Sequence, residues 1–369
     1  MNETLQDLMR SATRLTQAGR LNDATAAIQR ALRGGGGAVA TPSRPESSAM
    51  VLDGCVFEVD AAPPAAVPPR GAPTRTTPFT DGTHTHAGLT RTYKLFVPPA
   101  LTGKPRALVV MLHGCTQDPD DFAAGTGMNE AALEQGFVVL YPAQAQDANP
   151  SRCWNWFKHN HQERGRGEPA VIAGMTREVM KAHGIDPRRV YIAGLSAGGA
   201  MATIVAEAYP DLFAAVGVHS GLPRGAASSV PEALAVMGNG VARVGPPVRA
   251  PRVDAPPPPP PARVPTIVFH GDQDRTVHPR NGEQVLAAAL GGGVAAGARV
   301  ERGRASQGRH YTRSTHAAGN GTTQAEHWLL HGAGHAWSGG RSAGSYTDVT
   351  GPDATREMLR FFFEHPLGQ

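Results

Sequence analysis

The alternation of short apolar runs with helical patterns after residue 80 is the feature that most constrains the fold of this 369-residue sequence. Continuous apolar runs such as ALVVMLHG are typical of strands buried on both faces of a parallel sheet. Strands that alternate with helices predict an α/β fold with a doubly wound, mainly parallel sheet. The predicted strands are residues 91–98, 107–114, 137–142, 189–196, 214–221, 265–274 and 325–335, and the predicted helices are 128–136, 168–184, 197–210 and 351–365.

The first 79 residues have a different character. Residues 1–33 carry an apolar stripe at helical spacing, which predicts a small amphipathic helical hairpin. That stripe can pack on the main domain, or it can dock on a partner or a hydrophobic surface. Residues 34–79 are rich in Gly and Pro and predict a linker with a short strand near 50–59. The main domain is therefore predicted to span residues 80–369.

A proline-rich insertion occupies about residues 241–265 and contains six consecutive prolines. Proline has no N–H and a fixed φ, so this run cannot form a core helix or strand. It predicts an exposed polyproline-II segment. The segment is either a surface insertion that the fold tolerates or a ligand for proline-binding domains.

Composition argues against several classes of function. The net charge is +4, but the arginines are scattered and form no basic block interleaved with aromatics, so we expect no nucleic-acid binding. No apolar stretch reaches the roughly 18 residues of a membrane span. The N-terminus has neither the apolar core nor the cleavage site of a secretory signal, which predicts a cytoplasmic protein. Three cysteines are too few for a disulfide scaffold.

The pentapeptide Gly194–Gly198 has the pattern G-x-S-x-G. Such a pattern can arise by chance in a chain with 44 glycines, but here it lies between an apolar strand and a small-residue helix. That context predicts a nucleophile elbow with Ser196 as the nucleophile. The two glycines permit the tight turn, and the N-terminus of the following helix favours an oxyanion there.

A serine nucleophile needs a base, and the base needs an orienting acid. In α/β-hydrolases these groups follow in the order Ser, Asp or Glu, His. We predict Asp274 as the acid rather than Asp272, which is expected to make a local turn hydrogen bond. We predict His335 as the base rather than His331, which is expected to belong still to the last strand.

The oxyanion hole requires two hydrogen-bond donors. We predict the backbone N–H of Ala197 as the first donor and that of Cys115, in the loop MLHGCTQ, as the second. The Cys115 thiol is a poor rival nucleophile, because nothing nearby would lower its pKa. The other histidines, among them His84, His86, His159 and His161, have no acidic or Cys partners at ligand spacing, so we expect no metal site.

Six segments together resemble the polyhydroxybutyrate depolymerase family of serine esterases, which has the α/β-hydrolase fold. In order they are LHGCTQ, SRCWNWF, YIAGLSAGGAMA, HSGLP, FHGDQDRTVHP and HGAGHAWSGG, and they lie within residues 88–365. The wider family circle includes feruloyl and acetylxylan esterases. The resemblance implies hydrolysis of esters of 3-hydroxyalkanoic acids by Ser196, Asp274 and His335. It implies Cys115 and Ala197 at the oxyanion hole, with no metal and no organic cofactor.

The sequence departs from many members of that family, which are secreted and carry a polymer-binding domain. The N-terminal hairpin resembles instead the intracellular members that act on stored polyester granules. We therefore expect a cytoplasmic protein that associates with the granule surface, and the alternative is an extracellular one. The proline-rich insertion falls between the predicted nucleophile and the predicted acid.

Aromatic residues and cysteines near these motifs raise two further questions. Trp154, Trp156 and Trp337 are predicted to line an apolar substrate cleft, although the same spacing suits a core face. A disulfide between Cys115 and Cys153 would hold the tryptophan segment beside the oxyanion loop. A cytoplasmic location argues against that bridge, and export favours it.

Three functional hypotheses follow from this sequence. The first is an esterase that cleaves poly(3-hydroxybutyrate) or its oligomers through an acyl-Ser196 intermediate. The second is a feruloyl or acetylxylan esterase with the same triad and a different cleft, against which the missing secretion signal argues. The third is a non-catalytic granule-surface protein, which would not need a serine, an aspartate and a histidine at all three positions.

Overall fold

The computed structural model describes residues 79–99, 106–240, 263–291, 297–319 and 321–368. The chain divides into two units, 1–72 and 73–369, and all described residues belong to the second. The predicted hairpin at 1–33, the linker before Phe79 with its strand near 50–59, and residues 241–262 of the proline-rich insertion lie outside the described residues.

A ten-stranded sheet forms the centre of the described unit. Its six middle strands are parallel, and antiparallel strands flank them on both sides. This confirms the predicted α/β class with a mainly parallel sheet. Across the sheet the strands follow the order β1 (Phe79–His86), β2 (Leu89–Phe96), β4 (Val138–Pro142), β3 (Arg106–Leu112), β5 (Ile185–Leu195), β6 (Ala215–His219), β7 (Thr266–Gly271), β10 (Thr323–Leu330), β9 (His310–Ala317) and β8 (Arg299–Arg304).

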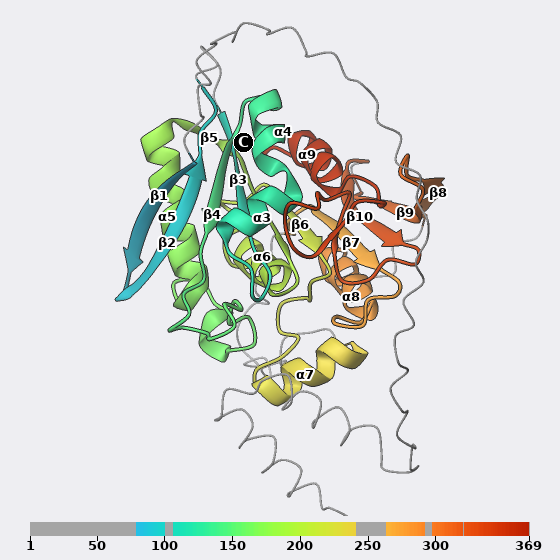
Figure 1. Ribbon diagram of the computed structural model, residues 1–369, viewed down its shortest axis with the longest axis horizontal. Coiled ribbons are helices and arrows are strands. Elements are labelled where there is room, and N and C mark those ends of the chain that lie inside the picture. The colour runs from blue at the N-terminus through green and yellow to red at the C-terminus, as the bar shows by residue number, and fades with distance from the viewer. Residues whose placement is uncertain (1–78, 100–105, 241–262, 292–296, 320, 369) are drawn as a thin grey trace, which may run out of the picture. The chain divides into compact units, whose positions relative to one another are not determined.

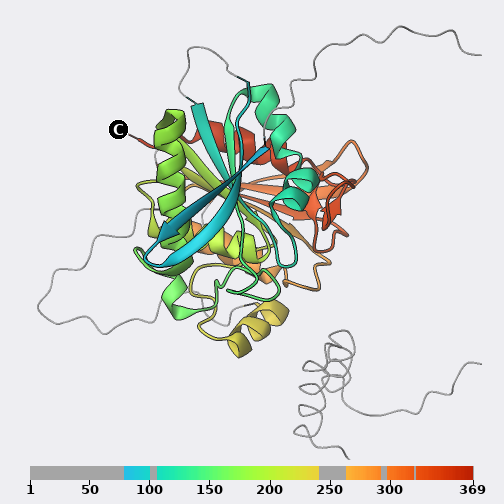
Figure 2. The ribbon, with the colours of Figure 1, turned by 60° about the vertical axis from the view of Figure 1, so that its left-hand side comes forward.

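Helices cover both faces of this sheet, as Figures 1 and 2 show. On one face lie α5 (Gly167–His183), α6 (Ala197–Ala208) and α8 (Arg280–Ala289). On the other lie α3 (Pro119–Thr126), α4 (Met128–Gln135) and α9 (Ala354–Glu364). Side chains alternate between two apolar cores, because successive residues of a strand point to opposite faces. In β3, for example, Val110 faces one core and Val109 the other.

The predicted helices correspond to α4, α5, α6 and α9, and the predicted strands to β2 through β7 and β10. Among the elements without a predicted counterpart are β1, β8, β9, α3, α7 (Val230–Asn239) and α8. The flanking strands carry mainly polar or half-exposed side chains, so they have no apolar run to mark them. Helix α7 packs on α8, away from the sheet, and Ala233 is its only buried residue (Figure 1).

The parallel strands bring separate loops to one edge of the sheet. Strands β3, β5, β6, β7 and β10 all end there, because their directions agree. The predicted triad residues and oxyanion donors each follow the end of one of these strands within five positions, as ligand-binding loops do in open α/β sheets. A two-stranded sheet of β11 (Trp337–Ser338) and β12 (Thr347–Asp348) follows the last of these loops. Within the described ranges, no helix is both long and apolar enough to cross a bilayer.

Candidate active site

Ser196 occupies a sharp turn between β5 and α6. Its φ of 57° and ψ of −121° are rare for a residue with a side chain. A side chain at Gly198 would collide with the backbone oxygen of Leu112, and one at Gly194 would collide with the backbone of Gly198. Only glycine fits at both places, which explains the G-x-S-x-G pattern. The Ser196 N–H donates to the backbone oxygen of His219 at 2.9 Å, which fixes the strained residue.

Asp274 and His335 form a hydrogen-bonded pair at this edge. Nδ1 of His335 lies 2.7 Å from Oδ2 of Asp274. The other carboxylate oxygen accepts the N–H groups of Thr276 and Val277, each at 2.9 Å. Burial raises the pKa of Asp274, but the hydrogen bond and charge of His335 and the Val277 N–H outweigh it, so the net pKa is lowered. An ionised carboxylate on Nδ1 orients the imidazole with Nε2 free to accept a proton.

A second Asp–His pair lies next to the first. Oδ2 of Asp272 is 3.0 Å from Nδ1 of His331, and its Oδ1 accepts the Gly332 N–H at 2.7 Å. The expected local turn bond of Asp272 is thus wrong, because both carboxylate oxygens reach across to the loop after β10. His331 lies one residue beyond that strand rather than within it. Its Nε2 is already 2.8 Å from the Thr312 hydroxyl, whereas no described residue bonds to Nε2 of His335.

His219 links the serine turn to the histidine loop. Its backbone oxygen holds Ser196, and its Nε2 accepts the N–H of Ser338, three residues after His335, at 3.0 Å. The ring is stacked between Phe269 and Trp337. Burial, reinforced by the neighbouring charge of His270, lowers the pKa of His219 to about 3, so the ring is neutral and can accept that bond. Sequence reasoning missed this residue, although it stands in the quoted segment HSGLP.

The predicted oxyanion donors lie on either side of Ser196. Ala197 is the first residue of α6, so its N–H has no acceptor within the helix. On the other side, a Cβ on Gly114 would lie 3.7 Å from Cβ of Ser196, which places the loop that carries Cys115 beside the serine. The Cys115 N–H makes no hydrogen bond to the part of the chain that the structure describes. Both amides are therefore available to a negatively charged oxygen.

His113 holds the loop that carries Cys115 from behind. The backbone N–H of Gln144 donates to its Nε2 at 3.1 Å, so Nδ1 carries the proton and donates to the oxygen of Gly114 at 2.8 Å. Burial lowers the pKa of His113 to about 4, which keeps the ring neutral. The Gly114 N–H in turn donates to the side-chain oxygen of Gln117 at 3.0 Å.

A disulfide joins Cys115 to Cys153. It connects the loop beside Ser196 to the segment that carries Trp154 and Trp156. The Trp154 indole N–H donates to the backbone oxygen of His113 at 3.1 Å, so this segment supports the same loop a second time.

The three tryptophans are core residues. Trp154, Trp156 and Trp337 are 0%, 4% and 1% exposed, so the prediction that they line an open substrate cleft is wrong. Trp154 and Trp156 pack in the core beneath α5 and α6, and Trp337 packs in the opposite core with its N–H on the Thr355 hydroxyl at 3.1 Å. Each ring is buried within the core on its own side of the sheet.

Glu168 is a fully buried carboxylate behind the disulfide-linked segment. It accepts the backbone and side-chain N–H groups of Asn155 at 2.8 and 2.7 Å, and the amide of Gln144 at 2.6 Å. Nη2 of Arg91 lies 3.6 Å from Oε1 of Glu168. Burial raises the pKa of Glu168, but its hydrogen bonds and the charge of His161 leave the net pKa lowered. Glu168 therefore joins Asn155 to Gln144, the residue whose N–H holds His113.

Backbone strain gathers around the same loops. Within the described residues, six residues other than glycine have positive φ, and one of them is Ala87 in the turn between β1 and β2. The other five lie in the site or beside it: Thr116, Arg152, Ser196, Ser220 and Tyr346. Strained residues persist only where their surroundings fix them, and they gather at functional sites.

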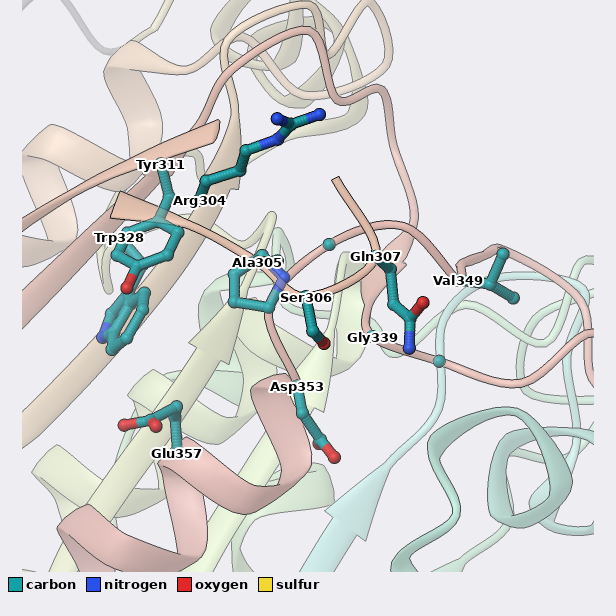
Figure 3. Close-up of a pocket in the computed structure, with 13 residues that line it drawn as sticks. Arg304, Ala305, Ser306, Gln307, Tyr311, Trp328, Gly339, Val349, Asp353 and Glu357 are labelled. Atoms are coloured by element: carbon teal, nitrogen blue, oxygen red, sulfur yellow. The ribbon is translucent and has the colours of Figure 1, made fainter. Parts of the chain in front are cut away.

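A pocket of about 420 Å³ lies elsewhere, between β8, β9, β10 and the start of α9 (Figure 3). The rings of Tyr311 and Trp328 lie together on one side of it, with centroids 4.9 Å apart, and Asp353 and Glu357 come from the α9 side. None of Ser196, Asp274 and His335 lines this pocket, so it is separate from the candidate active site. No cluster of three or more His, Cys, Asp or Glu side chains suited to a metal occurs among the described residues.

Comparison with known proteins shows esterases of related fold. The chain is 36% identical over 180 residues to "Poly(3-hydroxyalkanoate) depolymerase C" of Paucimonas lemoignei, which covers 48% of this chain and 43% of that protein. It is 29% identical over 194 residues to "Probable acetylxylan esterase A" of Aspergillus fumigatus, which covers 51% of each. The chain thus spans about half the length of the curated relatives it matches.

A solved structure shows the same fold. The acetyl xylan esterase from Aspergillus awamori superposes with a TM-score of 0.56 at 20% identity, over 74% of this chain and 94% of that one. The fold is therefore that of the α/β-hydrolases. Residues 91–309, more than half of the chain, match the family model described as Esterase PHB depolymerase, in a range that includes Ser196 and Asp274. The chain belongs to this family of esterases.

Proposed function

We propose that this protein is a serine esterase that works through an acyl-enzyme intermediate on Ser196. The observation that carries the proposal is the hydrogen bond between buried Asp274 and partly exposed His335, at the sheet edge where the strained Ser196 also lies. His335 is the general base and Asp274 its orienting acid. The amides of Ala197 and Cys115 are the oxyanion donors.

The proposed reaction has two halves. His335 takes the hydroxyl proton of Ser196 as the serine oxygen attacks the ester carbonyl. The two amides stabilise the tetrahedral oxyanion, and His335 then gives its proton to the departing alcohol. Water, activated by the same imidazole, attacks the acyl-serine and releases the acid. His219 supports both halves, because it fixes Ser196 and the segment that follows His335.

The favoured substrates are poly(3-hydroxybutyrate) and its oligomers. Membership in the family and the similarity to a poly(3-hydroxyalkanoate) depolymerase support this choice. A carbohydrate esterase that removes acetyl or feruloyl groups is the second candidate. The sequence and fold similarity to acetylxylan esterases supports it comparably.

The decisive test is turbidity loss of an amorphous poly(3-hydroxybutyrate) suspension, with the wild type beside Ser196→Ala. Clearing by the wild type alone supports both the polymer and the nucleophile. No clearing, with a p-nitrophenyl ester or acetylated xylan still cleaved, moves the substrate to the carbohydrate class. Equal hydrolysis by both proteins would remove Ser196 from its role, and no hydrolysis of any ester would favour the granule-binding alternative.

The location is a separate part of the proposal. Stable disulfides form in oxidising compartments, so the Cys115–Cys153 bond favours the extracellular alternative over the cytoplasm. Granule association depends on residues 1–33. Deleting them should weaken sedimentation with granules and spare hydrolysis of small esters if the cytoplasmic, granule-bound form is the right one.

A further inference from the structure

Tyr346 is a large aromatic residue that remains 46% exposed beside the candidate base. Its ring stands edge-on to the imidazole of His335, with ring centroids 6.4 Å apart and an interplanar angle of 80°. Its hydroxyl lies 3.2 Å from the hydroxyl of Thr116, the residue after Cys115. The side chain therefore extends from the base to the loop of the proposed oxyanion donor.

The backbone on both sides of this contact is strained and firmly held. Tyr346 has φ +51° and Thr116 has φ +68°. The oxygen of Tyr346 accepts the Trp337 N–H at 2.7 Å. The preceding Ser345 donates its N–H to Asp121 at 2.8 Å and accepts a bond from Gln117. The backbone that carries the ring is thus held independently of the bond between the two hydroxyls.

Stability does not account for this arrangement. Tyr346 belongs to neither apolar core, and its hydroxyl bond to Thr116 is solvent-exposed. Exposed neutral hydrogen bonds add little to folding, so this bond does little to offset the strain. An exposed aromatic ring on a rigid backbone is instead suited to contact with a ligand, because it offers a large apolar area at a small cost in conformational entropy.

We propose that Tyr346 determines specificity by forming the apolar wall against which the acyl chain of the ester packs. Resting on the proposed esterase function, this assigns to Tyr346 the role that the buried tryptophans cannot fill. The wall favours extended acyl chains such as 3-hydroxyacyl oligomers over an acetyl group, since a longer chain covers more of the ring.

The test compares p-nitrophenyl acetate with p-nitrophenyl hexanoate, and follows with a soluble 3-hydroxybutyrate trimer. For Tyr346→Ala we expect the ratio of kcat/KM for hexanoate to that for acetate to fall roughly ten-fold, mainly through KM. Tyr346→Phe keeps the ring, so its ratio should stay within about three-fold of wild type. Thr116→Val removes only the hydroxyl that bonds to Tyr346, so its ratio of kcat/KM values should be like that of Tyr346→Phe.

Val349→Ala is the matched control, because Val349 is an exposed apolar residue (51%) three positions further along. Its ratio should equal that of wild type. An unchanged ratio in Tyr346→Ala overturns the proposal, and so does an equal loss on both esters, which would mean that Tyr346 only supports the fold or the base. Failure of the esterase function itself is distinguishable, because wild type would then hydrolyse neither ester, and failure of the nucleophile assignment would show as activity that Ser196→Ala retains on both esters.

Discussion

Asp274 holds His335 through a 2.7 Å contact between Oδ2 and Nδ1, while two positions earlier Asp272 makes the corresponding contact with His331 at 3.0 Å. The two pairs differ in their surroundings. The side chain of Asp274 is fully buried, and that of Asp272 is 31% exposed. The Asp272–His331 pair can therefore serve as an internal control for the role of the Asp274–His335 pair.

Replacing Asp274 by Asn should lower kcat for a p-nitrophenyl ester by roughly 10³–10⁴-fold. The amide keeps the size of the side chain but loses the charge, and it can hold the imidazole in the wrong tautomer. The kcat of Asp272→Asn should stay within about three-fold of wild type. Its partner His331 is not available as a base, because Nε2 of that ring is hydrogen-bonded to the Thr312 hydroxyl. Steady-state kinetics of the two variants side by side, with thermal unfolding as a check on folding, measures this. A collapse of activity in Asp272→Asn would reverse the assignment of the two pairs.

Removing the disulfide through Cys153→Ser should lower the free energy of unfolding by roughly 3–4 kcal/mol, from the entropy of a loop closed over a separation of 38 residues. Cys153 is the better position to change, because Cys115 also supplies the proposed oxyanion amide. Urea unfolding with and without reductant measures the effect. Cys55→Ser is the control and should leave the sensitivity to reductant intact. If reductant has no effect on wild type, the bond does not form in solution.

Glu168→Gln should destabilise the fold by about 3 kcal/mol and lower kcat. The substitution leaves Arg91 buried without its carboxylate and puts an amide where several donors converge. The matched control is Glu178→Gln on the same helix, whose exposed carboxylate pairs with His84. Exposed pairs contribute at most about 1 kcal/mol, so this variant should unfold near wild type. Equal unfolding midpoints for the two variants would show that the buried network adds no stability.

Stability should fall as the pH drops below 6.5. Burial lowers the pKa of His113 to about 4 and that of His219 to about 3, whereas both titrate near 6.5 in the unfolded chain. Between those pKa values the unfolded state binds more protons than the folded state. Each buried ring therefore lowers the free energy of unfolding by about 2 kcal/mol at pH 5. The lowered pKa values of Asp274 and Glu168 change the free energy of unfolding only at a pH low enough to protonate carboxylates. The fall in stability between pH 6.5 and pH 5 is therefore due to the buried histidines.

Urea unfolding at pH 7.5, 6.5, 5.5 and 4.5 measures the slope of the free energy of unfolding against pH. His219→Gln keeps an acceptor for the Ser338 N–H and removes one titrating ring, so its slope in the window should be shallower than that of wild type. A flat profile for wild type between pH 7 and 5 would contradict the assignment of neutral, buried rings.

Local patterns were sufficient for the middle of the fold. Continuous apolar runs predicted the buried strands, and the helical segments that alternate with them predicted α4, α5, α6 and α9. The flanking strands β1, β8 and β9 were missed, because strands at or next to the edge of this sheet bury too few side chains to carry an apolar pattern. The tryptophans were misplaced for a related reason: a large aromatic residue suits a cleft and a core equally well, and the sequence does not say what covers it.

The sequence by itself determined the α/β class and predicted the order Ser196, Asp274, His335, because strand periodicity and loop position are local properties of a chain. Only the tertiary structure decided which aspartate bonds to which histidine. The two aspartates lie two residues apart on one loop and the two histidines four residues apart on another, so sequence position hardly distinguishes the possible pairs. It also decided which residues His219, Glu168 and Tyr346 contact. Ser338, the partner of His219, lies 119 residues away in the sequence, and Thr116, the partner of Tyr346, lies 230 residues away. Contacts of that kind exist only once the sheet has brought its strand ends to one edge.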